Sequence, residues 1–322
     1  MVLSLFVPVA RWLADRRSEL HIPDGFLSIP VALVFWVISA VVLGLALRRV
    51  QAGGRQAPLM GIMAAFIFAA QMINFPVAGG TSGHFVGGAL AAIVLGPWAG
   101  MLVVAAVVIV QALLFQDGGL IAIGPNVFNM AILTAAISYG LFRAVVNQST
   151  GVRLVVIGVG AWLSVVGSAL LLSLQLALSG TAALGVVAPP MIAVHAVIGL
   201  GEAAITVAAY LFISRTRPDL LTAGTAGGGG RGWVIAGAAV ALLVVVLSPL
   251  ASIDPDGLES VATQVGFGGH AQSAPYQTLP DYSVPGINDG AAGKVVAGAL
   301  GAVAVGVLTA GGIALVRRRP AG

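Results

Sequence analysis

Long apolar stretches alternate with short polar segments along almost the whole chain. A helix needs about 20 mostly apolar residues to cross the hydrocarbon core of a bilayer. Nine stretches approach this length, although the third is shorter than the others; they are residues 29–47, 57–75, 84–96, 98–116, 126–142, 154–178, 189–213, 232–250 and 295–316. The pattern predicts an all-α, polytopic membrane protein with about nine spans, namely a seven-helix core followed by two additional transmembrane helices.

The pair Gly96-Pro97 separates the third and fourth stretches. Proline lacks the N–H of a helical hydrogen bond, so we expect a break there. With two helices and an extracytoplasmic N-terminus, most of the fifteen basic residues face the cytoplasm, as the positive-inside rule requires; one merged helix would place most of them outside. The basic residues assigned to the cytoplasm are Arg48, Arg49, Arg55, Arg143, Arg153, Arg215, Arg217, Arg231, Arg317, Arg318 and Arg319.

The composition supports a membrane protein and excludes several other classes. Apolar residues make up 59% of the 322 residues and charged residues only 8%, with a mean hydropathy of +1.05. Soluble domains are about 25% charged, so a soluble globular protein, a disordered chain and a nucleic-acid-binding protein are excluded. The chain has no cysteine, which also excludes disulfides and thiolate metal sites.

A glycine-rich, basic segment, residues 214–231, predicts a flexible cytoplasmic linker. It divides the seven-helix core, residues 20–213, from a two-helix appendage, residues 232–322. Residues 1–19 fit neither part, because their apolar stretch is too short to span a membrane and their arginines would lie on the extracytoplasmic side. We expect residues 1–19 to be a misassigned or removed extension.

Two polar clusters lie at predicted extracytoplasmic ends of helices. His21 directly precedes a Pro-Asp-Gly turn sequence. The second cluster interrupts two apolar helices with three glycines and contains Asn74, Thr81, Ser82 and His84. Irregular backbone at membrane depth is tolerated where it lines a cavity, so this loop indicates a polar cavity; a flexible turn capped by a hydroxyl is the alternative.

Two ionisable residues, His195 and Glu202, lie inside the seventh predicted helix. Their spacing of nearly two turns places both on one face. Ionisable groups within a span are costly and indicate a functional site by default, although an interhelical hydrogen-bond clamp explains them equally well. His270, in the polar outer loop of the appendage, is expected to be solvated.

Four separated motifs, in order along residues 20–213, closely resemble the CbiM/NikM family. These proteins are the substrate-specific (S) membrane components of energy-coupling factor (ECF) cobalt and nickel transporters. The motifs are HIPDGFLS from His21, AQMINFPVAGGTSGH ending at His84, QALLFQDGGLIAIGPNVFNM from Gln111, and HAVIGLGEAAIT from His195. The run PDGLE from Pro255 resembles the PDGLE domain, an accessory unit that is fused here.

The resemblance implies that the chain binds Ni²⁺ or Co²⁺ as a transported substrate at its extracytoplasmic face. The implied ligands are the main-chain or terminal nitrogen of Leu20, the main-chain nitrogen and ring of His21, and the ring of His84. Four nitrogens in a plane suit Ni(II) or Cu(II). A free amine at residue 20 is a better ligand than an amide, which again favours a chain without residues 1–19.

The resemblance also implies the surroundings of the site and its partners. Asn74, Thr81 and Ser82 are expected to orient the loop around the metal. No organic cofactor is expected, and no nucleotide-binding loop of the form G-x-x-x-x-G-K-[ST] occurs in the sequence. The chain is therefore expected to be a transport subunit rather than an enzyme. Its implied partners are a transmembrane coupling (T) subunit and two cytoplasmic ATPases, in the inner (cytoplasmic) membrane.

Two alternative functions remain open from the sequence. The chain would be an S component for a different ligand, such as a vitamin, if the histidines did not bind metal. Alternatively, the run Gly80-Thr81-Ser82-Gly83 resembles the nucleophile motif of rhomboid intramembrane proteases, with His195 as the base that would activate Ser82.

Overall fold

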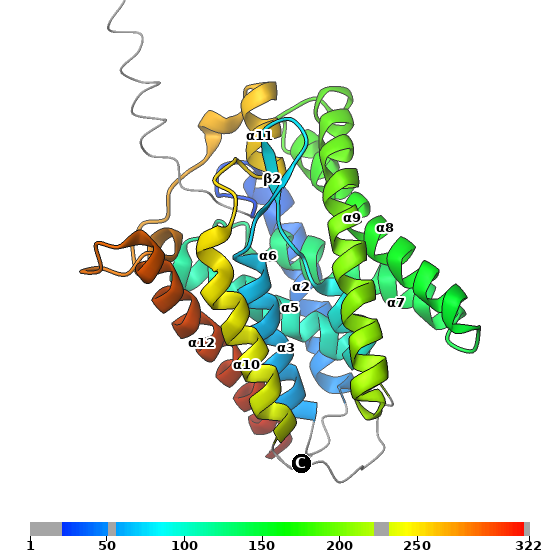
Figure 1. Cartoon of the computed structure of the whole chain (residues 1–322). Coiled ribbons are helices and arrows are strands. Elements are labelled where there is room, and N and C mark those ends of the chain that lie inside the picture. Colours follow the sequence, from blue (N-terminus) through cyan, green and yellow to red (C-terminus); the bar gives the residue numbers. More distant parts are fainter. Residues whose placement is uncertain (1–20, 51–55, 222–231, 319–322) are drawn as a thin grey trace, which may run out of the picture.

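All nine apolar stretches contain helix in the computed structural model, which describes residues 21–50, 56–221 and 232–318. The predictions for residues 1–19, for Leu20 and for most of the linker concern residues outside this part of the chain. The longer helices are α2 (Ile29–Arg49), α3 (Gln56–Gln71), α5 (Pro97–Val110), α8 (Thr150–Leu178), α9 (Leu184–Thr216), α10 (Gly232–Leu247) and α12 (Gly290–Arg318) (Figure 1). The shorter elements are α4 (Gly88–Leu95), α6 (Ile123–Val127), α7 (Thr134–Ala144), α11 (Gly257–Val265) and a hairpin of strands β1 (Phe75–Val77) and β2 (Thr81–Gly83).

Seven helical stretches of the described chain are long and apolar enough to cross a membrane. They are Ile29–Arg49, Pro97–Phe115, Ile123–Ala144, Thr150–Leu178, Leu184–Thr216, Gly232–Leu250 and Gly290–Leu315. Helix α3 has only 16 residues and α4 only 8, so helix length does not bear out the predicted number of nine spans. Only part of the predicted stretch 84–96 forms a helix. Residues 84–87 are non-helical, and Gly87 has a left-handed φ of 82°. The chain is a mostly helical, multi-pass membrane protein.

The two ends of the bundle differ in charge. At the lower end in Figure 1, which we call the basic end, α2 and α9 finish with Arg48, Arg49 and Arg215 in their last turns. At the upper end, which we call the polar end, hydrogen bonds connect four segments far apart in sequence, residues 21–28, 72–84, 117–122 and 251–282. These segments carry Asp24, Asp117, Asp254 and Asp256.

The break predicted at Gly96-Pro97 is confirmed. Helix α4 ends at Leu95, Gly96 adopts a φ of 84°, and α5 starts with Pro97. The next residue, Trp98, lies at the basic end, because the guanidinium of Arg49 is 5.4 Å from the centroid of its ring. Residues 84–98 therefore run from the polar end to the basic end, first as irregular chain and then as the short helix α4.

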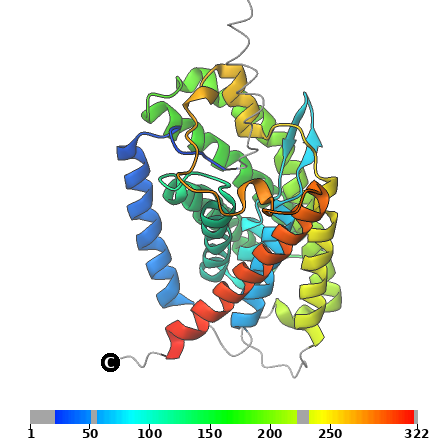
Figure 2. The ribbon, with the colours of Figure 1, turned by 90° about the vertical axis from the view of Figure 1, so that its left-hand side faces the viewer.

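The appendage packs directly on the core. Helices α10 and α12 lie against α3 on one side of the bundle, whereas α8 and α9 form a pair on the other side (Figure 1). Small residues allow this close approach, since a Cβ added to Gly61 of α3 would lie 2.6 Å from the carbonyl oxygen of Gly306 of α12. Figure 2 shows α12 crossing the bundle obliquely while the appendage loop runs over the polar end.

Candidate metal site

His21 is held by the loop that follows α5. Its neighbour Ile22 exchanges two hydrogen bonds with the side chain of Asn126: the Ile22 N–H donates to Oδ1 and Nδ2 donates to the Ile22 carbonyl, each at 3.1 Å. The carboxylate of Asp24 accepts the backbone N–H groups of residues 120–122. Glycine is needed at position 119, because a Cβ there would lie 2.1 Å from Oδ1 of Asp24. The Pro-Asp-Gly turn predicted after His21 therefore lies against the α5–α6 loop.

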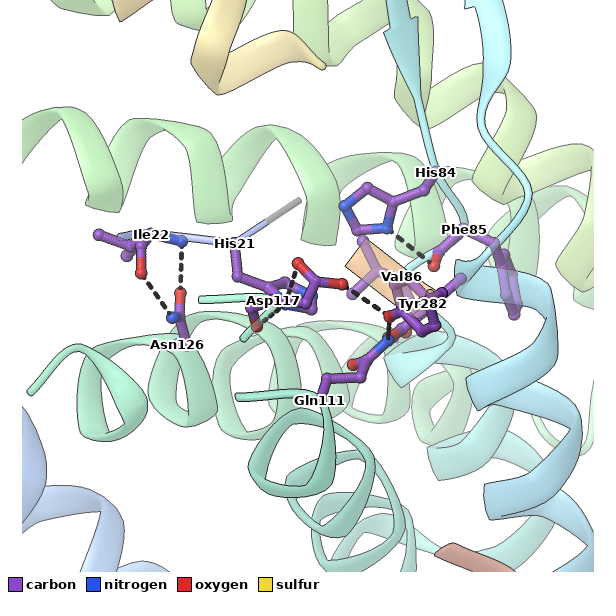
Figure 3. A network of polar contacts seen from close by, with 10 residues as sticks. His21, Ile22, His84, Phe85, Val86, Gln111, Asp117, Asn126 and Tyr282 are labelled. Atoms are coloured by element: carbon purple, nitrogen blue, oxygen red, sulfur yellow. Dashed lines mark hydrogen bonds and ion pairs between the residues drawn. The ribbon is translucent and has the colours of Figure 1, made fainter. Parts of the chain in front are cut away.

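The imidazole of His21 is buried and paired with Asp117. Its Nδ1 lies 3.0 Å from the Asp117 carbonyl oxygen and 3.2 Å from the carboxylate oxygen Oδ1 (Figure 3). Burial lowers the pKa of His21, but the charge and hydrogen bonds of Asp117 raise it more, so this pKa lies above its ordinary value. Burial likewise raises the pKa of Asp117, but His21 and a hydrogen bond from Tyr282 lower it to below its ordinary value. Asp117 thus occupies Nδ1 of the ring. The second nitrogen, Nε2, is buried and has no hydrogen-bond partner among the described residues.

His84 follows strand β2 and lies beside His21. The ring centroids are 5.7 Å apart and the ring planes are nearly perpendicular, at 89°. The His84 Nδ1 lies 3.2 Å from the carbonyl oxygen of Phe85. The non-helical segment after His84 is held from α9, where the buried carboxylate of Glu202 accepts the N–H groups of Val86 and Gly87. The two imidazoles that the sequence singled out are thus neighbours at the polar end.

The two rings line a cavity of about 90 Å³ whose walls come from both the core and the appendage. A third imidazole, that of His195, lines it as well. Its Nδ1 lies 2.8 Å from the Met191 carbonyl one turn earlier in α9, so Nδ1 donates and Nε2 carries the lone pair. The other walls include Asn126 and Asn129 after α5, Ser168 of α8, and Asp256 with Gly257 from the appendage.

The PDGLE motif contributes to this cavity through Asp256. The Asp256 side chain caps helix α11, with Oδ1 accepting the N–H of Glu259 at 2.7 Å. Burial raises its pKa to about 7, and the nearby charges of Glu259 and Asp117 add to this rise. A Cβ added to Gly257 would lie 2.9 Å from Cε1 of His195, so the motif approaches α9 closely.

The three residues expected to orient the metal loop all contact the appendage. The Ser82 hydroxyl donates to the Asp254 carbonyl at 2.8 Å, the Thr81 and Ser260 hydroxyls are 3.0 Å apart, and the Asn74 carbonyl accepts the Ser252 N–H. None of the three is among the residues that line the cavity. Among the described hydrogen bonds none joins Ser82 to His195, so the pairing that a serine protease would need is not observed.

Two residues beside His21, namely Asp117 and Tyr282, were not identified from the sequence. Asp117 lies inside the QALLFQDGG motif, where its acidic side chain beside two glycines was the available signal. Tyr282 carries no local signal at all, because only folding brings it to Asp117. In the described part of the chain, no group of three or more His, Asp or Glu side chains is arranged to hold a metal ion by itself. A site here would need main-chain nitrogen as well, and the nitrogen of Leu20 lies outside the described residues.

The chelate implied by the resemblance uses a different ring nitrogen from the one that faces the cavity. A chelate that joins the main-chain nitrogen of His21 to its own ring must use Nδ1, because Nε2 is too far from its own backbone. In the structure Nδ1 faces Asp117. The ring must therefore turn about its Cβ–Cγ bond for this chelate to close.

Comparison with known proteins agrees with the resemblance found in the sequence. Residues 21–220 match the family described as the cobalt uptake substrate-specific transmembrane region, and residues 231–318 match the PDGLE domain. A putative fused nickel transport protein NikMN of Archaeoglobus fulgidus is 38% identical over 307 residues, covering 92% of this chain and 98% of that protein. A fused nickel transport protein NikMN of Rhodobacter capsulatus is 28% identical over 346 residues, covering 93% of this chain and 99% of that protein.

Solved structures extend the likeness to the fold of the core. The crystal structure of a truncated transition metal transporter is 32% identical and superposes with a TM-score of 0.54, covering 61% of this chain and 98% of that one. A second transition metal transporter gives a TM-score of 0.55 at 31% identity. On its family match, its sequence motifs and its fold, this chain belongs to the CbiM family of cobalt uptake substrate-specific transmembrane regions, and it carries a PDGLE domain behind that region.

Proposed function

We propose that this chain binds a divalent transition-metal ion, Ni²⁺ or Co²⁺, at its polar end and carries it across the membrane as the substrate-binding subunit of an ECF transporter. The proposed ligands are the imidazoles of His21 and His84 and main-chain nitrogen from residue 20. The His21 ring binds through Nε2 as it lies in the structure, and through Nδ1 together with its own main-chain nitrogen once the ring has turned away from Asp117. The observation that carries the proposal is the pair of adjacent rings, 5.7 Å apart, that line one cavity. Relatives named as nickel and cobalt transport proteins support it.

The surroundings of His21 support a metal ligand. A metal-binding imidazole usually donates its other ring N–H to a carboxylate or carbonyl, which fixes the ring and makes it more basic. Asp117 provides both acceptors at one ring nitrogen. The other nitrogen, Nε2, is a buried polar atom with no partner among the described residues, and such atoms are costly unless something binds them.

The size of the cavity favours an ion over a vitamin. Pockets for small organic molecules measure about 300–1,000 Å³, whereas this cavity measures about 90 Å³. That volume holds an ion with a few coordinating atoms or waters. Three histidines and two asparagines supply nitrogen and oxygen atoms to walls that are otherwise mostly apolar.

The charge of the two ends supports a direction of capture. Arginines gather at the basic end and aspartates at the polar end, and by the positive-inside rule this supports a cavity on the extracytoplasmic side. We further propose nine crossings, because residues 84–98 connect the polar end with the basic end although α4 is short. The proposed partners, a T subunit and two ATPases, would act at the basic end in the inner membrane.

Metal titration of the purified full chain in detergent tests the proposal. Isothermal titration calorimetry with Ni²⁺ and Co²⁺ should detect one ion bound per chain. His21→Ala and His84→Ala should each weaken binding by about two orders of magnitude or more, since each removes one of a few ligands. His270→Ala is the matched control, because His270 is exposed in the outer loop of the appendage, and it should bind like the wild type. Equal affinities in all four proteins would refute the proposed site.

Transport itself needs a cellular measurement. Cells without their own nickel uptake should accumulate Ni²⁺ when the chain is expressed with the coupling subunit and the ATPases. The His84→Ala chain, or ATPases that cannot hydrolyse ATP, should abolish this accumulation. Accumulation that persists without ATP hydrolysis would contradict coupling of the ECF type.

A further inference from the structure

Asp256 of the PDGLE motif brings a carboxylate to the wall of the metal cavity. Its side chain is buried, with 4% of the residue exposed, and it lines the same cavity as His21 and His84. Among the described residues that line this cavity, no other is an acid and none is a lysine or an arginine. Asp117 is not part of the wall. The acidic group of the wall therefore comes from the appendage and not from the core.

The backbone on both sides of Asp256 holds it at the cavity. Before it, the carbonyl of Pro255 accepts the N–H of Ser82 in strand β2 at 2.8 Å. After it, Gly257 lies so close to α9 that an added Cβ would be 2.9 Å from Cε1 of His195. Contacts with β2 and with α9 thus fix where the carboxylate lies.

The two oxygens of the Asp256 carboxylate differ in their surroundings. Oδ1 caps helix α11 by accepting the N–H of Glu259 at 2.7 Å. Within the described part of the chain, no hydrogen bond reaches Oδ2. A buried carboxylate is costly in its charged form unless a cation or further hydrogen bonds compensate it. Oδ2 is therefore available to a cation in the cavity or to a water bound to that cation.

The proposed ligands leave part of the charge of the ion uncompensated. Imidazole and amine nitrogens bind a metal ion as neutral ligands, so at least one of its two positive charges remains even if one main-chain amide is deprotonated. Asp256 lies near enough to His21 for their charges to interact. Among the described residues, no group of three or more His, Asp or Glu side chains is arranged to hold a metal ion. Asp256 is thus placed to act from outside the set of direct ligands.

We propose that Asp256 is the counter-charge of the metal site: its carboxylate accepts a hydrogen bond from a water bound to the ion and balances the charge of the ion without being a direct ligand. This inference rests on the metal site proposed above. It holds for either ring nitrogen of His21, because the carboxylate faces the ion and not the ring. The cavity of about 90 Å³ has room for an ion and such a water.

The variant Asp256→Asn in the full chain tests the proposal. It removes the charge and keeps the helix cap, because asparagine caps a helix about as well as aspartate does. Calorimetric titration should show an affinity for Ni²⁺ about 10- to 100-fold lower than that of the wild type, as is usual when a group just outside the ligands is lost. Asp254→Asn is the matched control: it removes the same charge two residues earlier, from a side chain that accepts a hydrogen bond from Ser252 and does not line the cavity. It should bind Ni²⁺ as the wild type does.

Spectroscopy separates a counter-charge from a direct ligand and from a distorted site. The visible absorption spectrum of bound Co²⁺ reports the number and the geometry of the direct ligands. At saturating Co²⁺ it should be the same in Asp256→Asn as in the wild type, although the affinity is lower. In His84→Ala, which removes a proposed direct ligand, the spectrum should change. Without metal, Asp256→Asn and Asp254→Asn should both unfold at the thermal midpoint of the wild type.

The results also separate this inference from the proposed function. If the wild type binds no Ni²⁺, the metal site itself is wrong. If the wild type binds and Asp256→Asn binds within twofold, the site stands and the role of Asp256 is overturned. Equal losses in Asp256→Asn and Asp254→Asn would overturn it as well, since any nearby charge would then serve. A changed Co²⁺ spectrum in Asp256→Asn would contradict a role outside the direct ligands. If Asp256→Asn does not fold, Asp256→Ser also keeps an oxygen for the cap without the charge; it should show the same loss, and an unchanged affinity would count against the proposal.

Discussion

Oε2 of Glu202 lies 2.7 Å from the backbone nitrogen of Val86, two residues after His84. The second carboxylate oxygen accepts the N–H of Gly87 at 3.0 Å. These donors would otherwise be unpaired, because residues 84–87 belong to neither the hairpin nor α4. The intramembrane acid of α9 therefore holds the irregular segment that presents His84.

Glu202→Gln should loosen this segment. The substitution removes the charge and replaces one acceptor oxygen by an amide that cannot accept a hydrogen bond, so one of the two N–H groups loses its partner. We expect a loss of about 1–3 kcal/mol in the free energy of unfolding and weaker Ni²⁺ binding. Thermal unfolding in detergent and calorimetry would measure both. Ser214→Ala, on the same helix near the basic end, is the control and should change neither; a Glu202→Gln protein as stable as that control would contradict this role.

The His21–Asp117 pair predicts opposite pH trends for stability and for metal binding. The pKa of His21 is raised above 6.5, so its contribution to stability is present below that pH and is lost as pH rises through the raised value. The pKa of Asp117 is lowered from 3.8, so its contribution is present above that pH and is lost in stronger acid. Metal takes the unprotonated ring, so Ni²⁺ affinity should instead increase as pH rises through the pKa of His21.

Thermal midpoints of the metal-free wild type and of His21→Ala, recorded across pH, would check the first trend. The difference between them should be greatest between pH 3.8 and 6.5 and should shrink in alkaline buffer. A difference that grows toward alkaline pH would mean that the pair does not stabilise the fold in its charged form.

Single introduced cysteines can show on which side of the membrane each loop lies, because the chain has no cysteine of its own. Ala78→Cys in the hairpin and Ala271→Cys in the appendage loop are exposed at the polar end, and Gln148→Cys is exposed between α7 and α8. A maleimide that cannot cross membranes should label positions 78 and 271 in intact cells and position 148 only after permeabilisation. Labelling of 78 and 271 from opposite sides would show that residues 84–98 do not cross the membrane.

The residue at which the chain begins should affect its affinity for Ni²⁺. A protein that begins at residue 20 presents a free amine beside His21, whereas the full chain presents an amide nitrogen there. We expect the shorter form to bind Ni²⁺ at least about tenfold more tightly, and intact-mass measurement of the protein from its native cells to find residues 1–19 absent. Equal affinity of the two forms would remove the amine from the ligand set.

The sequence by itself determined the membrane class, the helical fold, the break at Gly96-Pro97 and the two histidines. Each of these depends on local properties: runs of apolar residues long enough for a bilayer, a proline without an N–H, and ionisable groups in apolar surroundings. The family motifs added the prediction that His21 and His84 act together. That they bind metal stays a prediction, as do the span count and the domain boundaries.

Only the tertiary structure decided what holds those histidines. Asp117, Glu202 and Tyr282 come from segments far from His21 and His84 in sequence, and no periodic pattern links them. Hydrogen bonds between distant segments depend on how the helices pack, and α12 packs on α3 because glycines at their contact leave room for it. For the same reason the sequence could not show that Asp256 and Tyr282 of the appendage reach the site of the core: local pattern encodes which residues enter a helix, and packing alone decides which side chains meet.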